Sequence, residues 1–432
     1  MGETAWRDPA ETNGGGGARS PGRLVTLDFI RGIAVLGILY ANIVGYAQPA
    51  VTSVWPGALP EPMGLADRIV WFVQFLLIDG KMRGLFAVLF GAGLVLFTEA
   101  KGNALQWRRL AWLGLFGAAH YFLLFRGDIL FSYALCGMVV LVIGAHRLPA
   151  ATALALGIAF YVLGAVFQAQ PFFAALPEES AALAACADAA RCVAAGGEDA
   201  YWANYAGMLG DAARETAVMR GGLWGIVGYN WTEHGTGLLS GGLMALCESF
   251  PSMLIGIGLY RAGLFDGGFD GDGDRRLLRW GLAGIAAGLL LTAPLAVWLV
   301  RAGDPFYLTF MIALGPAQIA RLPMVLGLAA WLAWLAPRAA DTALGQRLIA
   351  AGRMAFSNYL GTSLLMAMIF QGWGLGFFGE WGRTVLLLPM LFGCAVMLAW
   401  SRPWLARFAY GPLEWLWRCL TYGRIFPLKR AN

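Results

Sequence analysis

The sequence contains few charged residues, and this shortage excludes a water-soluble fold. Only 13% of its 432 residues are charged, whereas 59% are hydrophobic. Soluble domains carry about 25% charged residues, and one of this length could not bury so much apolar surface in a single core. In lipid the outward faces of helices are apolar as well. The composition therefore predicts an all-α integral membrane protein.

Histidine and the signature loops of several enzyme classes are also scarce. The chain has three histidines, and His120 alone falls within a predicted span, which excludes a membrane haem with paired axial histidines. Phosphate-binding glycine loops, zinc-peptidase motifs and nucleophile elbows are missing. The six cysteines show no metal-ligand spacing. We therefore expect no metal, no tightly bound cofactor and no nucleic-acid partner.

Ten apolar segments are long enough to cross a bilayer as helices. They are 24–46, 83–98, 108–125, 128–145, 149–168, 242–260, 277–300, 307–335, 347–370 and 383–401. A further apolar piece, 66–78, is too short to cross comfortably, so we expect a short interfacial or re-entrant helix there. The predicted fold is thus polytopic, with about ten transmembrane helices, and eleven is the alternative.

Basic residues gather at alternate junctions and in the C-terminal stretch 402–432, where Glu414 is the only acid. Because cytoplasmic loops carry an excess of Lys and Arg, we expect both termini in the cytoplasm and the protein in a bacterial-type inner membrane. Residues 1–22 are polar and glycine-rich, which predicts a disordered tail before a transmembrane domain over 23–401.

The long loop 170–240 then lies outside the cytoplasm. It mixes alanine-rich helical stretches with aromatic residues, a composition typical of segments on the outer bilayer surface. Two cysteines, Cys186 and Cys192, also lie in this loop. A disulfide between them is an open question, since it requires an oxidising compartment.

The first span carries a polar stripe made of Asp28, Arg31, Asn42 and Tyr46. At about 100° per residue these side chains fall within an arc of roughly 60°. Such a stripe faces protein or water, because polar groups facing lipid are costly. It either lines a polar route or consists of a helix cap, a snorkelling arginine and an interhelical hydrogen bonder.

The second polar group surrounds His120, which stands near the outer end of its span. Asp128 opens the next helix after a tight turn that contains Arg126. Imidazole is the side chain best suited to proton transfer near neutral pH, and a carboxylate partner would orient it. On the ten-span topology further charges share this outer face: Asp79, Lys81 and Arg83. The alternative roles are structural, with Asp128 as a helix cap and His120 as a hydrogen bonder.

Three further polar residues within spans are candidates for a binding site. Glu248 lies in the outer half of its span, and Arg321 falls mid-membrane in a segment whose Gly315 and two prolines should break the helix. We expect these two residues to pair. Asn358 is either a binding residue or an interhelical hydrogen bonder.

Motifs across most of the chain resemble the YeiB family (domain of unknown function 418). The first span reads Leu-Asp-Phe-Ile-Arg-Gly-Ile-Ala over 27–34, which is similar to the Leu-Asp-x-x-Arg-Gly-x-Ala opening of that family and, more loosely, to heparan-α-glucosaminide N-acetyltransferase. The resemblance continues over 81–93, 120–128, 352–359 and 411–416. It implies membership of a proposed transmembrane acyltransferase superfamily, whose members pass an acyl group from cytosolic acyl-CoA to an acceptor across the membrane.

On this resemblance the protein is a membrane-bound acyltransferase with acyl-CoA as co-substrate and an extracytoplasmic hydroxyl or amine as acceptor. The lysosomal enzyme has a catalytic histidine after the first span, whereas residues 47–63 here contain none, so His120 is the expected base and Asp128 its partner. We expect the remaining candidates to bind substrate or acyl-CoA: Asp28, Arg31, Asn42, Lys81, Arg83, Arg126, Glu248, Arg321 and Asn358. The alternative is a transporter of a small anionic or amphipathic metabolite. Homodimer formation is left open.

Overall fold

The computed structural model describes residues 21–59, 61–186, 192, 200–266 and 271–430. Within these residues the regular elements are helices, with one isolated bridge between Phe408 and Lys429. Most of the predicted disordered tail, 1–20, lies outside the described residues. The all-helical membrane fold predicted from the composition is confirmed.

Six helical stretches of the described chain are long and apolar enough to cross a membrane, and a seventh crossing results if a bent pair counts as one span. The six are α1 (Pro21–Ala47), α2 with α3 (Leu65–Leu77 and Lys81–Lys101), α6 (Ala150–Ala185), α12 (Asp272–Ala302), α13 with α14 (Phe306–Leu314 and Pro316–Ala339) and α17 (Arg383–Arg407). The bent pair is α10 (Gly237–Met244), continued by the short η4 (Ala245–Cys247), with α11 (Ser249–Arg261). The other predicted spans coincide with helices that do not meet the same criteria, namely α4 (Asn103–Leu123), α5 (Leu130–Val142) and α16 (Ala355–Phe370). The count of ten spans stays a prediction.

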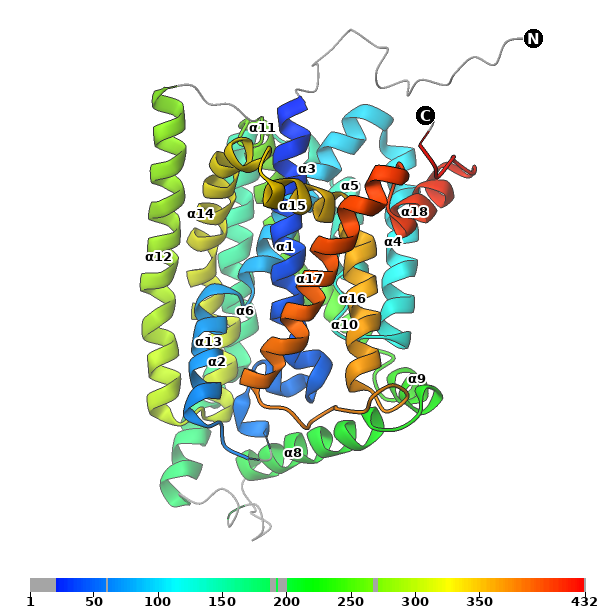
Figure 1. Ribbon diagram of the computed structural model, residues 1–432. Coiled ribbons are helices and arrows are strands. Elements are labelled where there is room, and N and C mark those ends of the chain that lie inside the picture. Colours follow the sequence, from blue (N-terminus) through cyan, green and yellow to red (C-terminus); the bar gives the residue numbers. More distant parts are fainter. Residues whose placement is uncertain (1–20, 60, 187–191, 193–199, 267–270, 431–432) are drawn as a thin grey trace, which may run out of the picture.

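The two ends of the helical bundle differ in what covers them. Figure 1 shows that α1 begins and α17 ends at the same end, which also holds α15 (Ala343–Arg353) and α18 (Pro412–Tyr422). We call this the tail end. At the opposite end, the α8 end, helix α8 (Ala200–Met219) lies across the bundle beside α9 (Leu223–Thr232). The stretch 402–432 is therefore largely helical, and α18 packs against α4 and α16.

The short helix predicted at 66–78 is α2, and the chain continues from it into α3. Helices α2 and α3 together form one candidate span of 37 residues, broken at Gly80, whose φ of +72° suits glycine. The charged cluster around Asp79 therefore lies in the middle of the span. That Asp79, Lys81 and Arg83 lie at the outer face stays a prediction, although their place inside one candidate span favours a deeper position.

Two other spans are broken. The predicted break in 307–335 is confirmed at Gly315, between α13 and α14. At the other end of α13, the Glu179 carboxylate of α6 accepts hydrogen bonds from Tyr307 N at 2.8 Å and Leu308 N at 2.9 Å. The predicted span 347–370 is not one helix, since α15 ends at Arg353 and α16 begins at Ala355.

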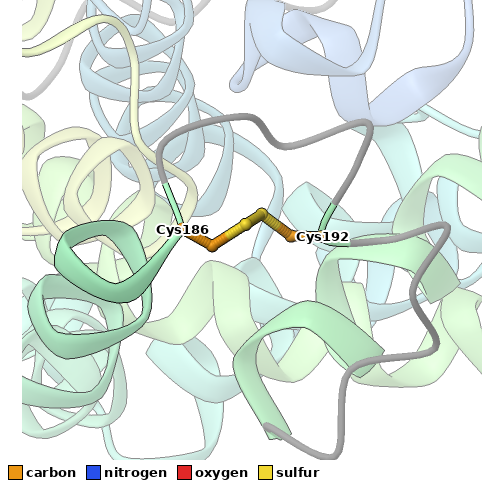
Figure 2. Close-up of a disulfide and its surroundings, with 2 residues drawn as sticks. All are labelled: Cys186 and Cys192. Carbon is orange, nitrogen blue, oxygen red and sulfur yellow. A yellow bond between two sulfur atoms is a disulfide. The ribbon is translucent and has the colours of Figure 1, made fainter.

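At the α8 end, the connection from α1 to α2 contains the short helices η1 (Ala50–Ser53) and η2 (Pro56–Ala58), which contact α8. A disulfide joins Cys186 and Cys192, whose Cα atoms lie 6.2 Å apart (Figure 2). The corresponding short connection at the tail end is η3 (Ala145–Arg147), between α5 and α6.

Candidate functional site

Two cavities enter the bundle from opposite ends. The outer cavity, of about 360 Å³, is lined by residues of α1, the α2–α3 break, α8 and α14. Aromatic rings form much of its wall, and its polar lining residues are Asn42, Tyr46, Asp79, Arg83, Arg126, Glu215, Asn230, Arg321 and Gln371. Glu215 holds α8 in place by accepting a hydrogen bond from Ala50 N at 3.2 Å. The volume falls in the range of small-molecule sites.

The inner cavity, of about 220 Å³, lies toward the tail end and is lined by three arginines, Arg31, Arg109 and Arg353. Arg31 pairs with Asp28 at 2.6 Å. Arg109 lies over the rings of Phe97 and Trp417, while the exposed Arg353 has no ion pair among the described residues. The deeper lining is apolar, with leucine, isoleucine and phenylalanine side chains.

Little negative charge opposes these arginines. Glu414 of α18 lines the same cavity, but it accepts hydrogen bonds from Phe356 N, Ser357 N and Ser357 Oγ. Burial raises the pKa of the Glu414 carboxyl, which lowers its tendency to carry charge. The inner cavity thus has arginines at its mouth and mainly apolar side chains along its inner wall.

The two cavities share a wall. Ile38 of α1 and Ile129, at the start of α5, line both of them. The stripe of α1 accordingly divides, with Arg31 lining the inner cavity and Asn42 and Tyr46 lining the outer one. One helix therefore contributes polar groups to both sides of this wall, the layer that the two cavities share.

His120 lies beside this layer. Its ring packs against Phe125, which lines the outer cavity, and against Tyr359, which lines the inner one, with centroid distances of 6.1 and 5.1 Å. The side chain is buried, and Nδ1 lies 2.8 Å from Oδ1 of Asp128. The other Asp128 oxygen accepts a hydrogen bond from Phe131 N at 2.7 Å. Asp128 thus acts both as a cap for α5 and as the partner of His120.

This contact determines the chemistry that His120 can perform. An ionised carboxylate only accepts hydrogen bonds, so the Nδ1 proton points toward Asp128 and Nε2 presents its lone pair. In the described part of the chain the buried Nε2 has no hydrogen-bond partner, and neither has the hydroxyl of Tyr359. A buried imidazole with one nitrogen anchored and the other free is the arrangement of a general base.

Gly117 of α4 allows this pair to form. A Cβ at Gly117 would lie 2.2 Å from Phe131 N and 2.8 Å from Oδ2 of Asp128. The start of α5 can therefore approach α4 only because residue 117 has no side chain. His120, one turn later on the same helix, then meets Asp128.

We expect Gly117→Ala to separate the start of α5 from α4 and to lower the unfolding temperature. The matched control is Gly114→Ala, because a Cβ there would meet only Ala134 Cβ at an ordinary 3.5 Å. Thermal unfolding of both variants would be measured in detergent. Equal behaviour of the two variants would contradict the role given to Gly117.

The outer cavity holds two ion pairs. Arg83 pairs with Glu248 at 2.5 Å, and Arg126 pairs with Glu215 of α8. The expected pairing of Glu248 with Arg321 is therefore wrong, because the break before α3 places Arg83 beside Glu248 instead. Arg321 reaches the cavity from α14 without an ion pair or hydrogen bond to any described residue.

Six predicted site residues line neither cavity: His120, Asp128, Glu248, Lys81, Asp28 and Asn358. Lys81 is fully buried and its ammonium donates to the carbonyl of Phe75 at the end of α2. Asp28 contacts Arg31 but lines neither cavity. Asn358 donates from Nδ2 to Ala351 O and Ser401 Oγ, at 3.1 Å each, and its Oδ1 accepts from Trp400 Nε1, which favours the alternative role of an interhelical hydrogen bonder.

The sequence reasoning missed several residues that line the cavities. Arg109 was visible only as a basic residue near a span end, and Glu215 only as an acid in the outer loop. Arg353 and Tyr359 lie in the motif over 352–359 but were not among the predicted site residues. Groups of His, Cys, Asp and Glu that could hold a metal ion are not found in the described residues.

Comparisons with known proteins agree with the motif resemblance. Residues 259–424 match a family described as "Protein of unknown function (DUF418)". The chain is 29% identical to "Uncharacterized protein YeiB" of Escherichia coli (strain K12), over 92% of this chain and 96% of that protein. It is 28% identical to "Uncharacterized protein YxaH" of Bacillus subtilis (strain 168), over 93% of this chain and 94% of that protein. No solved structure matches.

These similarities extend over nearly the whole length of both relatives, so they concern the membrane domain and the cavities together. Neither relative's description names an activity, so the similarity assigns none to this chain. The family match over 259–424 and the two relatives together support a YeiB-family protein.

Proposed function

We propose that the protein is a membrane-bound acyltransferase that moves an acyl group from cytosolic acyl-CoA to a hydroxyl or amine of an extracytoplasmic acceptor. The observation that carries this proposal is the buried His120–Asp128 pair beside the layer that separates two cavities. Two reactants that approach from opposite sides would meet at that layer. The histidine is the one group there suited to remove a proton from the acceptor.

The orientation follows from charge. Arginine and lysine residues cluster at the tail end, at the junctions and in α18, and the positive-inside rule assigns this end to the cytoplasm. The inner cavity then opens toward cytosolic acyl-CoA. Its arginines would bind the phosphates, because guanidinium groups form charge-assisted hydrogen bonds with phosphate oxygens. Its apolar depth would take the acyl chain.

The reaction needs two proton transfers, one from the acceptor to His120 and one from His120 to the CoA sulfur. His120 Nε2 takes the proton of the acceptor hydroxyl or amine, whose oxygen or nitrogen attacks the thioester carbonyl. The Tyr359 hydroxyl, which has no partner among the described residues, donates to the developing oxyanion. Collapse breaks the carbon–sulfur bond, and the imidazolium returns the proton to the departing CoA sulfur. The products are the acylated acceptor and CoA.

The test is calorimetric titration of acetyl-CoA into the full-length protein in detergent, with desulfo-CoA as a thioester-free comparison. We expect saturable binding that Arg353→Ala weakens by about tenfold, since one phosphate contact to a charged donor contributes roughly 1.5–3 kcal/mol. Arg402→Ala is the matched control, because Arg402 is also exposed near the tail end but lines neither cavity. Absence of binding by acetyl-CoA, longer acyl-CoA and free CoA would overturn the proposal.

A transporter is the second candidate, and the closed layer between two opposed cavities favours it. Broken helices such as α2–α3 and α13–α14 are also common at transport sites. Uptake of a small anion into proteoliposomes that contain no acyl donor would support transport. Transfer of a radiolabelled acetyl group without net uptake would exclude it.

A further inference from the structure

The ionisable groups around the outer cavity leave one positive charge without a counter-ion. Two of its cations have acidic partners, Arg83 with Glu248 and Arg126 with Glu215. Arg321 is only 8% exposed and lines the cavity, yet no carboxylate in the described residues lies within ion-pair distance of it. A buried, unpaired guanidinium is costly unless a ligand compensates its charge.

The Arg321 guanidinium packs directly against Gly80 at the α2–α3 break. A Cβ at Gly80 would lie 2.6 Å from Arg321 Cδ and 2.8 Å from its Nε and Nη1. The space that a side chain would fill at residue 80 is therefore occupied by the arginine. This packing holds Arg321 across the break, where Asp79, Gly80 and Arg83 also line the cavity.

The neighbouring acid does not neutralise the region. Asp79 accepts a hydrogen bond from Gln74 Nε2 at 3.1 Å and is surrounded by three cations, Lys81, Arg383 and Arg321. Two other acids act on Arg383: Asp304, which pairs with Arg68 at 3.0 Å, and Asp67, which accepts from Thr384. Asp79 is therefore shared among several cations and does not pair with Arg321 alone.

We propose that Arg321 binds a single acidic group, a carboxylate or a phosphate, of the molecule that occupies the outer cavity. The identity of that molecule as an acceptor rests on the proposed function, whereas the anion site does not. On the acyl-transfer scheme the acceptor then carries a hydroxyl or amine and one acidic group. The group belongs either to a soluble metabolite or to a lipid headgroup.

The experiment measures binding and thermal unfolding of the full-length protein in nanodiscs of neutral lipid. The probes are inorganic phosphate and two matched pairs, glucosamine 6-phosphate with glucosamine and glucuronate with glucose. We expect at least one acidic probe to stabilise the wild type and to bind about tenfold more tightly than an uncharged partner, as one charge-assisted contact predicts. Arg321→Gln should remove this preference and Arg321→Lys should retain part of it. Arg301→Gln, an exposed arginine at the end of α12, is the control.

A second arm replaces the neutral lipid by phosphatidylglycerol. Stabilisation by this lipid that is lost in Arg321→Gln would assign the acidic group to a lipid headgroup, and stabilisation by the soluble probes alone would assign it to a metabolite. Without ligand, Arg321→Gln should unfold at a temperature no lower than the wild type, because it removes an uncompensated charge.

Two results would overturn the proposal: no anion or anionic lipid distinguishes the wild type from Arg321→Gln, or Arg321→Gln is destabilised without ligand. These assays contain no acyl-CoA. Failure of acyl-CoA binding would therefore reject the transferase and leave the anion site intact. Failure of anion binding would reject the anion site and leave the transferase proposal intact.

Discussion

Replacement of His120 by alanine should lower the rate of acyl transfer by roughly 10²- to 10⁴-fold, the contribution of a general base, while the affinity for acyl-CoA stays within about twofold. Among the described residues at the layer between the cavities, the imidazole is the candidate base, and it does not line the arginine-rich cavity that would bind the nucleotide. The measurement is single-turnover transfer from labelled acetyl-CoA, with calorimetry on the same preparation. His146→Ala is the matched control, since His146 is also buried but lies in η3 at the tail end.

Two outcomes decide the assignment. Recovery of activity in His120→Ala on addition of free imidazole would support a proton-transfer role, because the removed ring leaves a space of its own size. A variant that transfers at the wild-type rate would reject the assignment, and the resemblance to acyltransferases would then lack a base.

Asp128→Asn separates the two roles of the carboxylate. Asparagine also caps helices well, so the hydrogen bond from Phe131 N is kept and the start of α5 should remain folded. The amide, however, does not hold the Nδ1 proton toward itself as a carboxylate does, and the wrong tautomer lowers the rate strongly in comparable triads. We expect slow transfer at unchanged thermal stability, which a purely structural cap would not produce.

The part of the site that could be predicted from the sequence is the part that is local in the chain. His120 and Asp128 are eight residues apart across one tight turn, so their approach follows from the turn itself. The polar stripe of α1 follows in the same way from helical periodicity. For these residues the structure adds the distances and the free Nε2 atom.

The part that could not be predicted depends on contacts between distant segments. Glu248 pairs with Arg83, which is 165 residues away, and the sequence equally allowed Arg321 as its partner. The position of Asp79 to Arg83 depended on whether 66–78 joins the next helix. Apolar length alone does not decide that question, because a glycine with positive φ permits either a turn back or a continued, broken span.

The inner cavity also depends on a contact between distant segments, which the sequence alone does not reveal. Arg31 and Arg353 line one mouth although 322 positions separate them, 353 minus 31. Each is adjacent to a glycine at the contact of α1 with α15. A Cβ at Gly32 would lie 2.0 Å from Leu348 O, and a Cβ at Gly352 would lie 1.8 Å from Asp28 O. The Arg-Gly and Gly-Arg pairs of the motifs thus bring two helices into backbone contact and place their arginines together.

Gly352→Ala should therefore destabilise the protein by about 3 kcal/mol or more, at the upper end of overpacking costs, because the clash is with backbone that cannot rotate away. The control is Gly361→Ala, a glycine of α16 with no atom within 4 Å of an added Cβ. Alanine is a better helix former than glycine by up to about 1 kcal/mol, so Gly361→Ala should be neutral or stabilising. Thermal unfolding in detergent compares the two. If Gly352→Ala unfolds at the same temperature as Gly361→Ala, α1 and α15 are not in backbone contact. The claim that this contact brings Arg31 and Arg353 together at one cavity would then be rejected.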